Sequence, residues 1–191
     1  MYQLSVVLLS ILSVFWPQAD APVPERWHAW PVARIFPLAV PGVSPSGARV
    51  TYVLTGVAPE APCRVAFQPA AVRPGCLTAL RATYADSTQT YVATVGIAVL
   101  DAPCPRPCPR PYGGVRPATV RPVAFPGGPA ERFGERQYFA GALAGSGDPY
   151  LVATAVGYAD GRAYRPGGRA APRLRGAARQ LAVALHRALT R

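Results

Sequence analysis

The chain has 191 residues and a mass of 20.1 kDa, the size of one domain with extensions. Half of the residues are hydrophobic, so the chain can bury a core, while 23 prolines and 18 glycines predict long irregular segments. This composition excludes a collagen, a coiled coil, a multi-span membrane protein and a large multidomain enzyme. It does not name a reaction.

The charge of the chain is strongly basic, with a formal net charge of +11 and an isoelectric point near 10.3. Such a balance favours an acidic partner or surface. All of the basic residues are arginine, as GC-rich codon usage tends to produce, so part of the charge reflects the genome. The clustering of the arginines is therefore more informative than their number, and they are densest toward the C-terminus.

The N-terminus carries an uncharged apolar run, LSVVLLSILSVFW, at residues 4–16. Its length fits the core of a signal peptide, of roughly 7 to 15 residues, better than a membrane span of about 20. No basic residue precedes the run, however, and Pro22 follows the small-x-small site that ends at Ala21. We therefore favour an anchor or uncleaved signal. A cleaved signal and a buried core helix are the less favoured alternatives. A start of translation upstream of Met1 would supply the missing basic and apolar residues.

Four cysteines agree with export, because an even number in an exported chain predicts disulfides. They are Cys63, Cys76, Cys104 and Cys108. Three connectivities are possible, and we favour the most local one, Cys63–Cys76 with Cys104–Cys108. The second pair has a C-x3-C spacing and not the C-x2-C of redox and zinc modules. A redox dithiol, a thiolate metal site and a haem contact are the alternatives there, and we expect no metal and no cofactor.

The chain divides into three regions: a membrane anchor or signal (1–16), a Pro-rich juxtamembrane stalk (17–49) and an extracytoplasmic domain (50–191). The tryptophans and other apolar residues of the stalk predict that part of it docks on the domain. Within the domain, β-branched and aromatic runs predict two hairpins, with ADSTQ and GSGDP as their turns. The predicted strands are 50–57, 77–84, 90–100, 120–125, 138–144 and 150–158, and residues 101–122 are predicted to be loop.

A helix is predicted from Leu174 to Arg191. At about 100° per residue its apolar side chains share one face, and these are Leu174, Ala178, Leu181, Leu185 and Leu189. The opposite half holds the polar side chains Arg175, Arg179, His186, Arg187 and Arg191. In the first interpretation the helix covers one face of a sheet. In the second it lies on an anionic membrane, with these four arginines as the anionic-surface residues.

The order of these segments resembles a group of uncharacterised extracytoplasmic proteins of high-GC Gram-positive bacteria that have one N-terminal membrane anchor. The pieces that carry the resemblance are RWHAWPVARIFP, the pair Cys63 and Cys76, and VAFPGGPAERFG. The resemblance covers roughly residues 16–190 and implies a single-pass location at the cell membrane, with the domain outside. No activity comes with it. The chain departs from the group at 101–112, where the resemblance implies a helix and the sequence has CPRPCPRP. The resemblance therefore does not extend to Cys104 and Cys108.

Catalytic patterns are absent from the sequence. His28 lies in the stalk and His186 is predicted on the solvent half of the last helix, and neither is bracketed by a nucleophile elbow. There is no Walker loop, no G-x-G-x-x-G and no H-E-x-x-H. Catalytic residues are therefore unknown, and whether the chain is an enzyme stays open with a preference for no.

Together these patterns predict an α+β domain. Its antiparallel sheet has about four to six strands, a C-terminal amphipathic helix covers one face, and an N-terminal hydrophobic helix anchors it. The expected function is a non-enzymatic accessory or interaction protein of the cell envelope, with the membrane, anionic lipids or wall polymers and a protein as partners. The alternatives are an envelope hydrolase with an unrecognised site and a basic nucleic-acid-binding protein in the cytoplasm, although we expect no nucleic-acid partner outside the cell.

Overall fold

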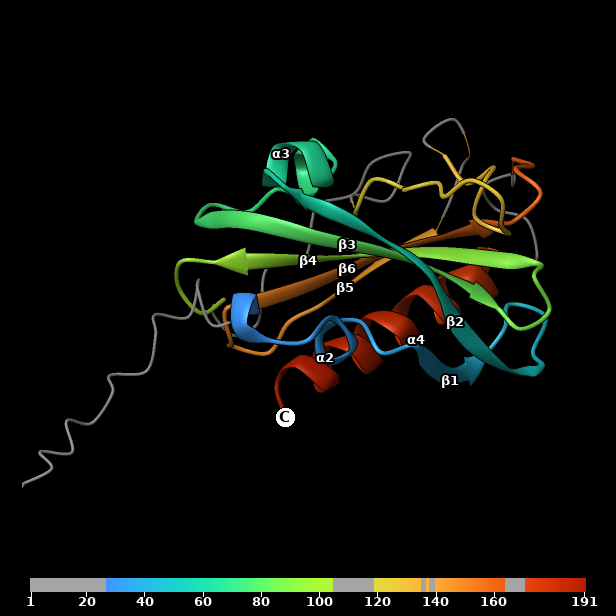
Figure 1. Cartoon of the computed structure of the whole chain (residues 1–191), viewed down its shortest axis with the longest axis horizontal. Helices are drawn as coiled ribbons and strands as arrows, with labels where there is room; N and C mark the ends of the chain where they lie inside the picture. The colour runs from blue at the N-terminus through green and yellow to red at the C-terminus, as the bar shows by residue number, and fades with distance from the viewer. Residues whose placement is uncertain (1–26, 105–118, 135–136, 138–139, 164–170) are drawn as a thin grey trace, which may run out of the picture.

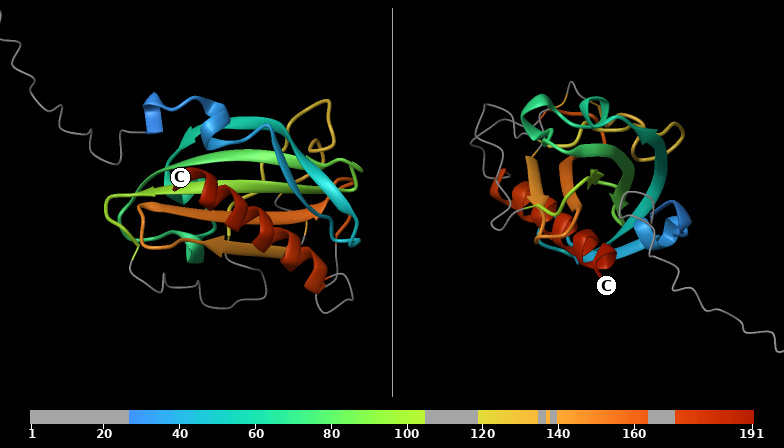
Figure 2. Two further views of the ribbon diagram at one scale, coloured as in Figure 1. Left: turned by 90° about the horizontal axis from the view of Figure 1, so that it is seen from below. Right: turned by 90° about the vertical axis from the view of Figure 1, so that its left-hand side faces the viewer.

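The structure is a computed structural model that describes residues 27–104, 119–134, 137, 140–163 and 171–191. The predicted anchor and the first part of the stalk therefore lie outside the described residues. A six-stranded antiparallel sheet curls around the C-terminal helix (Figures 1 and 2). This arrangement confirms the predicted α+β architecture of an antiparallel sheet with a C-terminal helix.

The strands follow the order β1-β2-β3-β4-β6-β5, and every neighbouring pair is antiparallel. Their bounds are β1 Ala39–Val43, β2 Arg49–Ala61, β3 Cys76–Asp86, β4 Tyr91–Leu100, β5 Ala140–Ala144 and β6 Tyr150–Tyr158. The hairpins β3–β4 and β5–β6 are the two predicted from their turns. Strand β1 is an addition from the predicted stalk, and it forms one edge of the sheet.

The β3–β4 turn owes its shape to one buried carboxylate. Asp86 is 1% exposed and accepts bonds from the hydroxyl of Thr88 and from the backbone N–H groups of Thr90 and Tyr91, at 2.7, 2.9 and 3.1 Å. These bonds satisfy donors that the turn cannot pair within the ladder. The turn thereby fixes the register of the longest hairpin in the sheet.

Helix α4 (Ala171–Leu189) fills the concave face of the sheet. Its predicted apolar face is buried against β5 and β6, with Leu181 and Leu185 fully inaccessible to solvent. The hydroxyl of Thr154 on β6 donates to the Ala178 carbonyl at 2.7 Å. The first interpretation of this helix, a cover for the sheet, is the one that the packing confirms.

The convex face carries a second apolar layer. Here the segment from Thr119 to Val123 crosses β4 at Gly96, where a Cβ atom would lie 2.5 Å from a methyl group of Val120. The predicted strand 120–125 is wrong: only a single bridge joins Val120 to Phe67. Pro122 has no N–H for a ladder, and the N–H of Val123 donates to the Thr94 hydroxyl instead.

The short helices lie at the borders of these layers. Their bounds are η1 Trp27–Ala29, α2 Val32–Ile35, α3 Cys63–Ala66 and η2 Pro69–Ala71. Trp27, Ile35 and Phe36 belong to the concave core, so the described part of the stalk docks as predicted. No helix in the described ranges has the length and apolar character that a membrane crossing needs.

The molecule has two distinct ends. The start of the described chain and the C-terminus lie at one end of the sheet, while the β1–β2 turn and the first turns of α4 lie at the other (Figures 1 and 2). Anything that binds at the β1–β2 turn is therefore remote from the start of the described chain.

Candidate functional site

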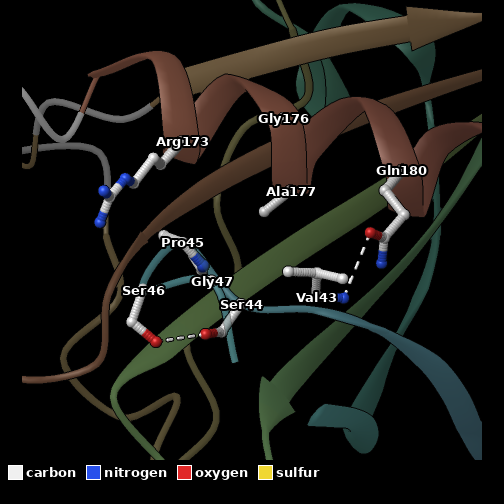
Figure 3. Close-up of a pocket in the computed structure, with 9 residues that line it drawn as sticks. All are labelled: Val43, Ser44, Pro45, Ser46, Gly47, Arg173, Gly176, Ala177 and Gln180. Atoms are coloured by element: carbon white, nitrogen blue, oxygen red, sulfur yellow. Dashed lines mark hydrogen bonds between the residues drawn. The ribbon is translucent and has the colours of Figure 1, made fainter. Parts of the chain in front are cut away.

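A groove of about 370 Å³ lies between the β1–β2 turn and the flank of α4 (Figure 3). The turn supplies one wall and the first three turns of the helix supply the other. The lining residues are Val43, Ser44, Pro45, Ser46, Gly47, Arg173, Gly176, Ala177 and Gln180. This volume is in the range of small-molecule sites, about 300–1,000 Å³.

The turn wall is held by its own hydrogen bonds. The N–H of Ser44 donates to Ala48 O and the N–H of Gly47 donates to Ser44 O, both at 2.9 Å. Gly47 has a φ of 95°, which a glycine adopts without strain. The hydroxyls of Ser44 and Ser46 lie 2.5 Å apart and point toward each other (Figure 3). The wall is therefore ordered before any ligand arrives.

Gln180 joins the helix wall to the edge strand. Its side-chain carbonyl accepts the N–H of Val43 at 3.2 Å, while the Val43 carbonyl accepts the Tyr52 hydroxyl at 3.1 Å. A Cβ atom at residue 42 would collide with the Gln180 amide nitrogen, so the amide can pack here only because residue 42 is glycine. The amide nitrogen is buried and has no hydrogen-bond partner in the described chain.

The polar groups of the groove are mainly donors. Arg173 brings five N–H donors and a fixed positive charge, whereas the amide nitrogen of Gln180 is buried against Gly42. One of the two serine hydroxyls donates to the other, which leaves one hydroxyl proton free for a ligand. No lining residue is acidic. The groove is therefore suited to a ligand that is rich in acceptors and negatively charged.

The sequence prediction did not single out this arginine. The predicted anionic-surface residues are all exposed, but none of them lines the groove; Arg175, Arg179 and Arg187 lie on α4, and Arg191 lies just beyond its end. The spacing of Arg173, Gly176, Ala177 and Gln180 is i, i+3, i+4, i+7, which puts an arginine, an amide and two small residues on one helical stripe. This spacing is visible in the sequence, and it could have indicated that these four residues share one side of the helix.

The second polar cluster lies at the other end of α4. His186 is buried, and its Nε2 lies 2.8 Å from a carboxylate oxygen of Asp148 in the β5–β6 turn. The predicted solvent position of His186 is therefore wrong: the turn crosses the last turns of the helix and covers the imidazole. His28, the other histidine, is exposed and lies 3.5 Å from Glu60.

Asp148 is nearly saturated with donors. The Tyr150 N–H and the Ser146 hydroxyl lie 2.9 and 3.0 Å from its oxygens. Partial burial acts to raise the pKa of this carboxyl, but the contact with His186 and these two hydrogen bonds outweigh it and hold the pKa below its ordinary value. The carboxylate thus fastens the β5–β6 turn to the C-terminal end of α4.

We expect Asp148→Asn to destabilise the fold by about 1–2 kcal/mol at pH 7. Because the pKa of Asp148 is lower in the folded than in the unfolded chain, its contribution is present above about pH 4 and is lost as the pH falls through the folded value. Urea unfolding of both proteins at pH 7 and pH 3 should show the difference closing. Asp160→Asn, at a half-exposed carboxyl, is the control, and an equal effect of the two substitutions would contradict the fastening role.

The disulfide prediction is confirmed for its first pair. Cys63 and Cys76 are bonded, with their Cα atoms 6.2 Å apart, and they join α3 to the start of β3. Cys104 is also in a disulfide, whereas Cys108 lies outside the described residues. Within the described ranges no group of three or more metal-binding side chains gathers. All three described cysteines are therefore in disulfides.

A second hollow, of about 260 Å³, lies beside the β3–β4 turn. Its lining mixes Arg132 with Glu131 and Asp160, so it has no single charge preference.

No family model matches the chain, and no significant match to it is found among curated proteins or solved structures.

Proposed function

We propose that the chain is a membrane-associated extracytoplasmic domain of the cell envelope that acts by binding and not by catalysis. The Cys63–Cys76 disulfide carries this proposal, because disulfides persist in oxidising compartments outside the cytoplasm. The apolar run at residues 4–16 and the resemblance to anchored extracytoplasmic proteins support the same location.

The chemistry of the end where the described chain begins supports contact with a membrane. The guanidinium of Arg34 lies 4.0 Å from the ring centre of Trp30, and Val32 between them in sequence is 56% exposed. Arg187 and Arg191 are exposed at the C-terminal end of α4, which packs against α2. Aromatic, apolar and cationic side chains together suit the interface of an anionic bilayer.

The alternative is an envelope hydrolase, and the contact of Asp148 with His186 is the observation that favours it. In a hydrolytic triad the imidazole stands between the acid and the nucleophile. Here the Ser146 hydroxyl and His186 Nε2 both approach the same carboxylate oxygen. The carboxylate, and not the imidazole, therefore lies between the other two groups, which supports a structural role for the three side chains. We accordingly prefer the binding role to the hydrolase.

Topology provides the test of the envelope role. Alkaline phosphatase fused after Arg191 is expected to be active in a bacterial host, because it folds only where disulfides form, and the matching β-galactosidase fusion is expected to be inactive. Equal expression of the two fusions is the control, measured by immunoblot. The opposite pattern of activities would remove the envelope role.

A further inference from the structure

The outer surface of the η1–α2 segment (residues 28–39) is almost entirely apolar. Ile35 and Phe36 hold the segment to the concave core. Val32 and Leu38 are 56% and 69% exposed, and among the described residues they are the two most exposed large hydrophobic side chains. The exposed apolar residues of the segment are Ala29, Pro31, Val32, Ala33, Leu38 and Ala39. Apolar side chains this close together on a surface mark an interaction site.

The charges around this surface are mainly positive. The segment contains no acidic residue, and its Arg34 guanidinium lies 4.0 Å from the ring centre of the partly exposed Trp30. Helix α2 packs against α4 (Figure 2), and Arg187 is exposed in the last turn of α4. The acidic side chain that contacts the segment is Glu60, 3.5 Å from His28. An apolar surface with tryptophan and arginine suits the headgroup region of an anionic bilayer.

The length of the preceding chain brings this surface close to lipid. The predicted anchor ends at Trp16, and the ten residues 17–26 separate it from Trp27. Even a fully extended chain of this length reaches only about 40 Å. Lipid is therefore always within reach of the η1–α2 segment, whereas a protein partner would have to be recruited to it.

We propose that the η1–α2 segment lies in the headgroup region of an anionic bilayer and is a second membrane attachment beside the predicted anchor. The inference rests on the proposed function, since it names the surface and the lipid class through which the domain contacts the membrane. In this orientation Val32 and Leu38 enter the boundary between headgroups and acyl chains. The β1–β2 turn lies at the other end of the molecule (Figure 1) and points away from the bilayer.

Fluorescence of Trp30 in the full-length chain tests the proposal. The chain has three tryptophans, so Trp16→Phe and Trp27→Phe leave Trp30 as the single reporter and keep aromatic rings at both positions. This chain is placed in nanodiscs, one chain per disc, that contain brominated phosphatidylglycerol or brominated phosphatidylcholine. Trp30 emission should be quenched in the phosphatidylglycerol discs and less in the phosphatidylcholine discs. The ratio of quenched to unquenched emission measures lipid contact.

Two variants with matched controls test the surface itself. Val32→Asp should lower the lipid-contact ratio at least about tenfold, because it removes the burial of an apolar side chain. The control Val53→Asp changes a valine of β2 that is 47% exposed, and it should change the ratio less than twofold. Arg34→Gln should lower the ratio in phosphatidylglycerol about fivefold, and Arg175→Gln, in the first turns of α4, should have little effect. All four positions are exposed, so the melting temperatures should stay unchanged.

Unquenched Trp30 in the phosphatidylglycerol discs, equal quenching in the two lipids, or equal losses for Val32→Asp and Val53→Asp would each overturn the proposal. Quenching that changes when a disc holds two chains would assign the surface to a second copy instead. The proposed function fails separately: a chain that does not enter the discs, or a cytoplasmic fusion result, contradicts that function. An inserted chain with Trp30 away from lipid contradicts only the second attachment.

Discussion

Replacing Leu181 by alanine is expected to lower the free energy of unfolding by about 2–5 kcal/mol. Leu181 is completely buried in the core between α4 and the concave face of the sheet. The substitution removes its contacts and leaves a cavity that the six-stranded sheet can close only in part. Urea unfolding of the full-length chain, followed by circular dichroism, measures the change.

Arg179→Ala is the matched control, because Arg179 is on the same helix and exposed. It should cost less than about 1 kcal/mol, as surface positions usually do. Equal unfolding midpoints for the two variants would contradict the packing role. If Leu181→Ala weakened liposome binding and left stability unchanged, α4 would instead be a helix that adsorbs to the membrane.

Removing the Cys63–Cys76 disulfide is expected to cost about 3 kcal/mol, the chain-entropy value for a loop of this length. The two residues are 13 apart in sequence, and Cys63 is buried with Phe67 and Ala66 in the convex core. The double substitution Cys63→Ala and Cys76→Ala avoids a buried hydroxyl. Urea unfolding without reductant measures the loss and leaves the disulfide of Cys104 in place.

Peptide mapping under non-reducing conditions provides the control for this experiment. Protein taken from the cell envelope should yield one linked peptide that contains Cys63 and Cys76. Free thiols at both positions, or an unchanged unfolding midpoint in the double variant, would contradict the stabilising role of the bond.

Elements with a local signal could be predicted from the sequence. The turns ADSTQ and GSGDP lie between β-branched runs, so β3–β4 and β5–β6 were both recognised as hairpins. The spacing of Leu174, Leu181 and Leu185 predicted both α4 and its buried face. These signals succeed because hydrophobic periodicity reflects burial within a single segment.

Elements whose own sequence carries no clear strand signal, or a misleading one, were predicted wrongly. Strand β1 contains Pro41 and Gly42, which weaken any strand pattern, and it is extended because β2 pairs with it and Gln180 holds its last N–H. The segment 120–125 looks like a strand, yet its N–H groups donate to separate partners, that of Arg121 to the Ala66 carbonyl and that of Val123 to the Thr94 hydroxyl. No ladder with one strand results. Pairing across the chain decided both outcomes.

The polar sites show the same division between sequence and tertiary structure. The sequence by itself determined the arginine-rich composition and the apolar face of α4, and it favoured the pair Cys63–Cys76 among three connectivities. The burial of His186 was decided by the β5–β6 turn, which brings the Asp148 carboxylate against the helix. The groove at Arg173 required the turn at Ser44 and the helix together. A helical wheel describes one segment, whereas this groove has walls from two, and only the folded chain brings those segments together.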